Sequence, residues 1–186
     1  MLYDKDIREP LCFYLEDRFG RIRIFDEITI KKSRADLVAV LPNTLIGIEI
    51  KSNADTYARL KGQTRDYNKF FDYNYIAVGL RHEKHVSEHI PASWGILCIY
   101  ENNRKIVIEE KRPALQNTKA SLSNQLSLLW KRELYDILDR NHLPKYRQKS
   151  RQFICTKLME KLSEDVLKKE FCHQLFERDY TIFEEA

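Results

Sequence analysis

Apolar side chains are spaced in two different ways along the chain. Strands are predicted in six segments: residues 21–30, where apolar positions alternate, residues 75–80, which form an apolar run, and residues 34–41, 45–51, 95–100 and 105–110. Apolar positions three and four residues apart predict helices in two segments of the same part: residues 4–18 and 56–71. Beyond about residue 121 only helical spacing remains. The pattern therefore predicts an α+β part over residues 1–115 and a helical part over residues 118–183.

Local signals add detail to these elements. Pro10 lies inside the first predicted helix and indicates a kink or a later start. The oxygens of residues 52–55 are candidates to cap the second helix, and Asn102-Asn103 is typical of a hairpin turn. One face of the strand at 21–30 is expected to carry four side chains: Ile22, Ile24, Ile28 and Ile30. Short connections predict that the first three strands form a meander.

Composition narrows the class of protein. The chain has 186 residues, 43% of them hydrophobic, and only five glycines and five prolines, which excludes collagen-like and low-complexity chains. Four cysteines without a C-x-x-C pair indicate reduced thiols in a cytoplasmic protein. No apolar run approaches the length of a membrane span, so no membrane association is expected. A net charge of +4 is compatible with a nucleic-acid partner.

Two acidic residues and one lysine are predicted to meet on the sheet. Glu49 and Lys51 project to the same side of their strand, and Gly47 on that side is expected to leave room beside Glu49. The meander brings Asp36, on the preceding strand, alongside. Two adjacent carboxylates repel unless a cation lies between them, and hard oxygen ligands suit Mg²⁺ or Mn²⁺. A lysine beside such an ion can stabilise the charge that develops on a phosphoryl group.

The helix after these strands carries Gln63 and Tyr67 on one face, four residues apart. Taken in order, three motifs resemble the PD-(D/E)xK nuclease superfamily, in the branch with a RecB-like Q-x-x-x-Y helix: Arg34-Ala35-Asp36, Glu49-Ile50-Lys51 and Gln63-x-x-x-Tyr67. The resemblance covers about residues 4–80, with Ala35 in place of the proline of the literal motif. It implies a restriction-endonuclease-like αβββαβ core, followed here by a helical appendage.

The resemblance also implies a role for each site residue. Asp36 and Glu49 would hold the metal together with the Ile50 carbonyl, and Lys51 would be the catalytic lysine. Gln63 and Tyr67 would brace the site or touch the DNA backbone. The superfamily often adds one further acid, for which the chain offers two open alternatives, Asp4 and Glu27.

Basic residues outside the motifs are candidates for contacts with nucleic acid. Arg34 and Arg59 are either phosphate contacts or ordinary surface charges. The segment from 143 to 158 contains no acid and is either a phosphate-contacting arm or a solvated helix face; three of its basic residues are Lys145, Arg147 and Lys149. The helical part also offers apolar stripes for a second copy of the chain or another protein.

The sequence thus favours a cytoplasmic nuclease that uses Mg²⁺ or Mn²⁺ to hydrolyse phosphodiester bonds, with DNA as the expected substrate and phage defence or DNA repair as its setting. Three alternatives remain open. The chain could bind nucleic acid without cutting it, act as an inhibitor or adaptor through its helices, or cut only as a subunit of a larger assembly.

Overall fold

The computed structural model describes residues 2–180 and is built around one six-stranded mixed sheet, whose strands lie side by side in chain order. The strands are β1 (Arg23–Ile30), β2 (Ser33–Leu41), β3 (Thr44–Lys51), β4 (Tyr73–Gly79), β5 (Gly95–Asn102) and β6 (Lys105–Arg112). β3, β4 and β5 pair in parallel, and the other neighbours pair antiparallel. The expected meander of the first three strands is confirmed, and every strand end lies within two residues of its predicted position.

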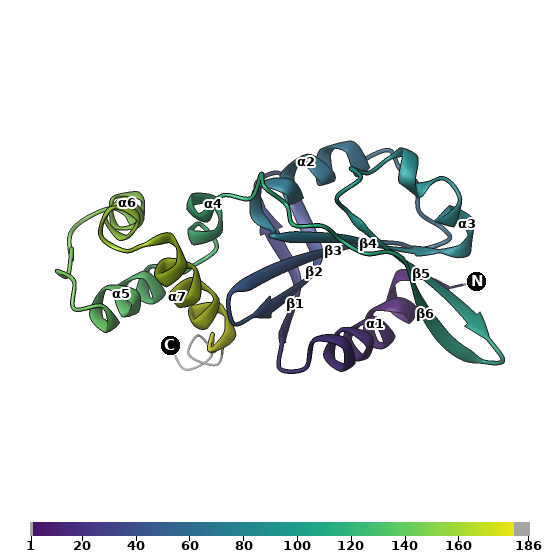
Figure 1. Cartoon of the computed structure of the whole chain (residues 1–186), viewed down its shortest axis with the longest axis horizontal. Helices are drawn as coiled ribbons and strands as arrows, with labels where there is room; N and C mark the ends of the chain where they lie inside the picture. The colour runs from purple at the N-terminus through teal and green to yellow at the C-terminus, as the bar shows by residue number, and fades with distance from the viewer. Residues whose placement is uncertain (1, 181–186) are drawn as a thin grey trace.

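Seven α-helices and one 3₁₀ turn occur within residues 2–180. They are α1 (Asp4–Phe19), α2 (Leu60–Phe70), α3 (Leu80–Glu83), the turn η1 (Val86–Glu88), α4 (Leu122–Leu126), α5 (Lys131–Arg140), α6 (Arg151–Lys161) and α7 (Glu164–Phe176). α1 covers one face of the sheet, and α2 and α3 cover the other (Figure 1). We refer to α4–α7 as the helical unit, which lies beside the sheet. The chain is therefore a mixed α+β protein.

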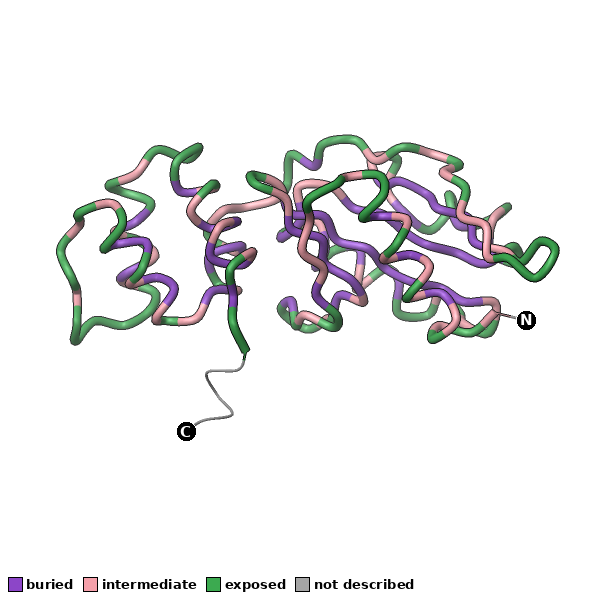
Figure 2. Tube along the Cα trace, turned by 90° about the horizontal axis from the view of Figure 1, so that it is seen from below, coloured by how far each residue is buried: buried purple, intermediate pink, exposed green. Residues whose placement is uncertain are grey.

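Two apolar clusters hold these layers together. Ile7 and Leu11 of α1 pack under the sheet against residues such as Ile48. On the opposite face, Leu60 and Phe70 of α2 belong to a cluster that continues into the helical unit, where it includes Phe171 of α7. Figure 2 shows the buried trace following the strands and continuing into the helical unit. Because this second cluster is shared, the helical unit and the sheet bury part of their apolar surface against each other.

The apolar positions of β1 do not share one face, and the expectation for them is wrong. Ile24 packs in the cluster under α1, whereas Ile28 and Ile30 pack in the cluster on the α2 side. Glu27, which lies between Ile24 and Ile28, has a backbone φ of 57°, a value that residues other than glycine rarely adopt. This backbone conformation interrupts the alternation, so the strand presents different faces before and after Glu27.

Three further expectations are corrected. α1 begins at Asp4 and runs through Pro10, so the later start does not occur. The second helix begins at Leu60 rather than at residue 56, because the Asp55 carboxylate accepts hydrogen bonds from the Ser52 amide (2.8 Å) and hydroxyl (2.7 Å) instead of capping a helix. The turn between β5 and β6 consists of residues 103 and 104, one position later than expected, with φ values of 49° and 62°.

A polar cluster around Asp72, just after α2, links the sheet to the helical unit. The Asp72 carboxylate accepts hydrogen bonds from the Leu45 amide of β3 (2.6 Å) and from Gln125 Nε2 of α4 (3.0 Å). Lys168 Nζ of α7 donates to the same carboxylate (2.5 Å) and to Gln125 Oε1 (2.7 Å). One side chain thus connects β3, α4 and α7.

The boundaries of the two parts follow from these elements. The sheet ends at Arg112 and the first helix of the helical unit begins at Leu122. Residue 183, the end of the helical part expected from the sequence, lies outside the described residues. None of the helices in residues 2–180 combines the length and apolar character needed to cross a membrane.

Candidate active site

Strands β2 and β3 separate at Asp36, and this opening holds the site. Their antiparallel pairing ends at Leu37 and Ile48, one residue short of Asp36 and Glu49. The Ile50 amide then donates to Asp36 Oδ2 at 2.8 Å, so a side-chain carboxylate takes the place that a strand carbonyl would have. The Asp36 side chain is therefore fixed at the junction of the two strands.

Glu49 lies at the centre of the site and is fully buried. Lys51 Nζ and Gln63 Nε2 both donate to its Oε1 atom, the latter at 2.5 Å. The Tyr67 hydroxyl donates to Oε2 at 2.7 Å. A carboxylate removed from water needs such partners, and Glu49 has three, supplied by β3 and α2.

Tyr67 joins the two acidic residues. Its hydroxyl, which donates to Glu49, also accepts a hydrogen bond from the Asp36 amide at 3.1 Å. Burial and the negative charge of Glu49 raise the pKa of this phenol well above its ordinary value, so Tyr67 remains a donor at neutral pH. The structure therefore brings together all five residues that the sequence assigned to catalysis: Asp36, Glu49, Lys51, Gln63 and Tyr67.

Gly47 does not leave open space beside Glu49, contrary to expectation. A Cβ atom at this position would lie 2.2 Å from the ring of Phe71, the residue that follows α2. The ring occupies the space that the missing side chain leaves, next to the ring of Tyr67 at a centroid distance of 5.1 Å. Gly47 thus allows the end of α2 to approach the sheet, which positions Tyr67 over the strands.

The ionisation of Asp36 is strongly perturbed. Burial raises its pKa from an ordinary 3.8 to about 7, and the negative charge of Glu49 adds to the rise. The Ile50 amide, Lys51 and Arg8 oppose this rise. The carboxylates of Asp36 and Glu49 lie close together where little water reaches them, and a divalent cation bound between them would stabilise their negative charges.

Arg8 of α1 is the site residue that sequence reasoning missed. Its guanidinium contacts Asp4 Oδ2 (2.7 Å) and Asp26 Oδ1 (3.0 Å), donates to the Asp36 carbonyl (3.1 Å), and lies 3.8 Å from Asp36 Oδ1 and 3.9 Å from Glu27 Oε1. The only local signal was the spacing of Asp4 and Arg8, four residues apart on a helix. The other contacts join α1 to β1 and β2 and depend on the fold.

The two candidates for an additional acid, Asp4 and Glu27, have the same ion-pair partner. Asp4 and Glu27 both pair with Arg8, which also lies 3.8 Å from Asp36 Oδ1. Within residues 2–180 no three or more His, Cys, Asp or Glu side chains are grouped so that they could hold a metal ion. The oxygen donors at hand are those of Asp36, Glu49 and the Ile50 carbonyl, which suit Mg²⁺ or Mn²⁺ if water completes the coordination shell.

A polar cleft of about 660 Å³ leads to these residues and is lined by both Asp36 and Gln63. It lies between the β1–β2 turn and the first half of α2. Five exposed basic residues line it, which we call the cleft cations: Lys31, Lys32, Arg34, Arg59 and Arg65. The structure therefore places both Arg34 and Arg59 beside the candidate site. Lys31, Lys32 and Arg65 were not singled out from the sequence, although Lys31 and Lys32 form a basic pair at the strand turn.

The remaining predicted basic contacts lie elsewhere. Residues 141–150 connect α5 to α6, at the end of the helical unit that is farthest from the sheet (Figure 1). We call the three exposed basic residues of this segment the loop cations: Lys145, Arg147 and Lys149. Lys145 Nζ pairs with Asp139 at 2.7 Å. The loop cations therefore do not belong to the cleft.

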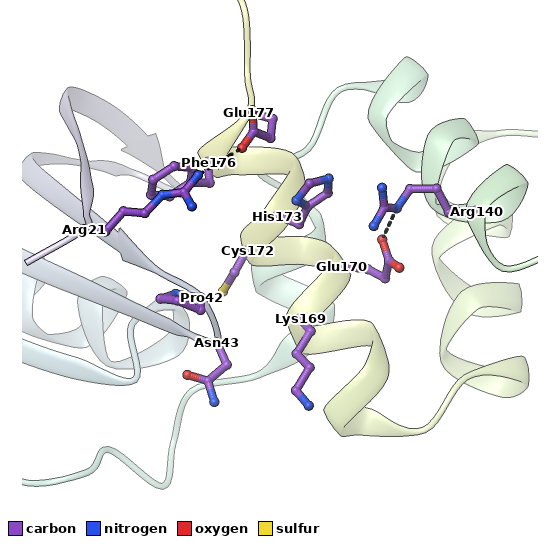
Figure 3. A pocket seen from close by; sticks show the side chains of 10 residues that line it. All are labelled: Arg21, Pro42, Asn43, Arg140, Lys169, Glu170, Cys172, His173, Phe176 and Glu177. Atoms are coloured by element: carbon purple, nitrogen blue, oxygen red, sulfur yellow. Dashed lines mark hydrogen bonds and ion pairs between the residues drawn. The ribbon is translucent and has the colours of Figure 1, made fainter.

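A second cavity, of about 430 Å³, lies between α7, α5 and the β2–β3 turn (Figure 3). Its lining combines apolar side chains such as Phe176 and Pro42 with charged ones, among them an ion pair between Arg140 and Glu170 at 2.9 Å. Within the described part of the chain it shares no lining residue with the cleft. Because it contains none of the five predicted catalytic residues, we take the cleft as the candidate site.

Comparison with known proteins gives a family. Residues 14–185 match the family described as bacteriophage P4 protein cII. No curated protein matches the chain. Among solved structures, SfsA of Pyrococcus furiosus in complex with Ca²⁺ is similar at 11% identity and a TM-score of 0.36; the chain spans 63% of its length and the similarity covers 63% of this chain. Since the family match extends over nearly the whole chain, this protein belongs to the bacteriophage P4 protein cII family.

Proposed function

We propose that this protein is a metal-dependent nuclease with a restriction-endonuclease-like core of the PD-(D/E)xK superfamily. The observation that carries the proposal is the convergence of Asp36, Glu49 and Lys51 at the separation of β2 and β3. The order of the first elements, α1-β1-β2-β3-α2-β4, agrees with the core of that superfamily. The proposed substrate is DNA, and the proposed setting is phage defence or DNA repair in the cytoplasm.

In this proposal each residue has a task. Asp36, Glu49 and the Ile50 carbonyl would hold Mg²⁺ or Mn²⁺, which supplies a Lewis acid and lowers the pKa of bound water. Tyr67 and Gln63 hold the Glu49 carboxylate in a fixed orientation through donated hydrogen bonds. The Lys51 ammonium, anchored on Glu49, stabilises the negative charge that develops on the phosphoryl group.

The acidic residues around Arg8 extend the site on the side of α1. Arg8 lies 3.8 Å from Asp36 Oδ1, one oxygen of the carboxylate that would hold the metal. Its charge lowers the pKa of Asp36 and keeps the carboxylate available for a cation. Glu27 or Asp4 would supply the additional acid by turning from Arg8 toward the metal.

The test measures metal binding and cleavage in parallel. Calorimetry with Mn²⁺ should detect binding to the unaltered protein and no binding to Asp36→Asn or Glu49→Gln. The exposed residue Glu88 provides the matched control Glu88→Gln, which should bind as the unaltered protein does. Single- and double-stranded DNA and RNA are then incubated with Mg²⁺, Mn²⁺ or EDTA, and cleavage should require the metal.

Two results would contradict the proposal in different ways. Undiminished Mn²⁺ binding in both site variants would remove the metal site. A protein that binds nucleic acid and leaves it intact under every metal condition would have the alternative function, that of a non-cleaving binding or adaptor protein on a nuclease-like fold.

A further inference from the structure

Gly62 is the third residue of α2, an 11-residue helix, and nothing in the described structure requires a glycine there. A Cβ atom built at Gly62 meets no atom within 4 Å, in contrast to Gly47. Among the described glycines only Gly20 has a positive φ, so the backbone of Gly62 is open to any residue. Glycine inside a helix lowers stability relative to alanine, because it loses more backbone freedom on folding.

The position of Gly62 suggests a functional reason for this loss of helix stability. It lines the cleft together with Arg59, which immediately precedes α2, and Gln63, the next residue of the helix. Without a side chain, the helix backbone is exposed to whatever enters the cleft. Glycine is used where a ligand must approach a backbone closely. The open space above Gly62 is therefore a place for contact with a bound molecule.

The charge of the cleft indicates an anionic ligand. Arg34 pairs with Glu27 at 3.1 Å, and Arg65 lies 3.8 Å from Asp66. The other three cleft cations form no ion pair within residues 2–180: Lys31, Lys32 and Arg59. Positive charge that the protein does not neutralise itself is available for phosphates.

The side chains of the cleft also indicate which part of a nucleic acid the cleft would contact. Among the described residues that line it none is aromatic, so this lining offers no ring on which a base could stack. Cationic side chains and an exposed backbone suit the sugar-phosphate chain, whose contacts carry no sequence information.

We propose that the cleft binds the phosphodiester backbone of a nucleic acid, which lies directly against α2 at Gly62 and is held by the cleft cations without recognition of bases. The inference rests on the proposed function only in that it places this backbone beside Asp36 and Gln63. Binding itself needs no metal and no cleavage.

The test compares stability with affinity in EDTA. Gly62→Ala should raise the melting temperature by about 1–4 °C, because alanine favours the helix. It should also weaken binding of a mixed-sequence DNA duplex, measured by fluorescence anisotropy, by about threefold or more, with an unchanged salt dependence. Thr156→Ala, on an exposed position of α6, is the matched control and should leave affinity unchanged.

A second variant tests the charges. Replacing Lys32 and Arg59 with glutamine should lower the slope of log affinity against log salt by about one for each lost contact. Duplexes of different sequence should bind equally well. Polyglutamate should compete poorly; equal competition would mean that the cleft takes acidic peptides and would overturn the proposal.

The two proposals fail separately. Full affinity in Gly62→Ala together with an unchanged salt slope in the double variant would overturn the cleft proposal, even if the protein cleaves DNA. Binding that changes as expected without any metal-dependent cleavage would overturn the nuclease and leave the cleft proposal standing.

Discussion

Replacing Asp36 with asparagine should make the metal-free protein more stable at pH 8 while it loses metal binding. The asparagine carbonyl can still accept the hydrogen bond that the Ile50 amide donates to Asp36 Oδ2 at 2.8 Å. The change therefore removes a negative charge and keeps the contact between the strands. The charge is unfavourable in the fold, because Asp36 is mostly buried and adjacent to Glu49.

The size of the effect follows from the two pKa values. Asp36 has a folded-state pKa of about 7 and an ordinary pKa of 3.8, so between these values the folded state binds more protons than the unfolded state. Stability then falls as the pH rises from about 4 to 7. At about 1.4 kcal/mol per tenfold change, the ionised carboxylate costs the fold about 4 kcal/mol above pH 7.

The assay is urea unfolding in EDTA from pH 4 to 8. We expect Asp36→Asn to be about 2–4 kcal/mol more stable than the unaltered protein at pH 8, and of similar stability at pH 4. Asp26→Asn is the control, because Asp26 also contacts Arg8 but its side chain is 64% exposed. An Asp36→Asn variant that is less stable at pH 8, or that keeps the pH dependence, would refute the reasoning.

Three other changes test separate parts of the structure. Lys51→Ala should leave Mn²⁺ binding intact and lower turnover by about a hundredfold, and full activity would make Lys51 a structural residue. Arg178→Ala should cost about 3–5 kcal/mol in urea unfolding, because it leaves buried Glu133 without its ion-pair partner at 2.7 Å. Arg140→Ala, which removes an exposed arginine from its pair with Glu170, should cost at most about 1 kcal/mol. Reversing the loop cations to glutamate should weaken binding of a long duplex but not of one that covers only the cleft, and equal weakening of both would place the loop beside the cleft.

The elements were predictable because apolar spacing reports them directly, while some details depend on the backbone. The change of face in β1 comes from the φ of Glu27, which no apolar pattern encodes. The late start of α2 comes from Asp55, because its carboxylate accepts hydrogen bonds from Ser52 and therefore does not cap the helix. In both cases the apolar spacing predicts the right type of element, and a local dihedral angle or hydrogen bond changes which face it presents or where it begins.

The centre of the site was predictable for a geometric reason. Glu49 and Lys51 alternate with Ile48 and Ile50 along one strand and so share a face, and a meander must bring Asp36 alongside. Arg8 was not predictable, since its contact with Asp36 joins residues 28 positions apart on a helix and a strand. The filling of the space at Gly47 by Phe71 likewise depends on how α2 approaches the sheet.

The cluster around Asp72 has a consequence for how the chain folds as it is synthesised. The sheet is complete once residue 112 has emerged from the ribosome, but two donors to the Asp72 carboxylate, Gln125 and Lys168, are made later. Until then the junction between α2 and β4 lacks two of its polar partners, and the apolar surface that α7 covers is open to solvent. The nascent chain therefore passes through a stage with a formed sheet and an exposed flank. We expect a gene fragment that ends near residue 115 to make a protein that aggregates, and the missing helices, supplied as a separate chain, to rescue it.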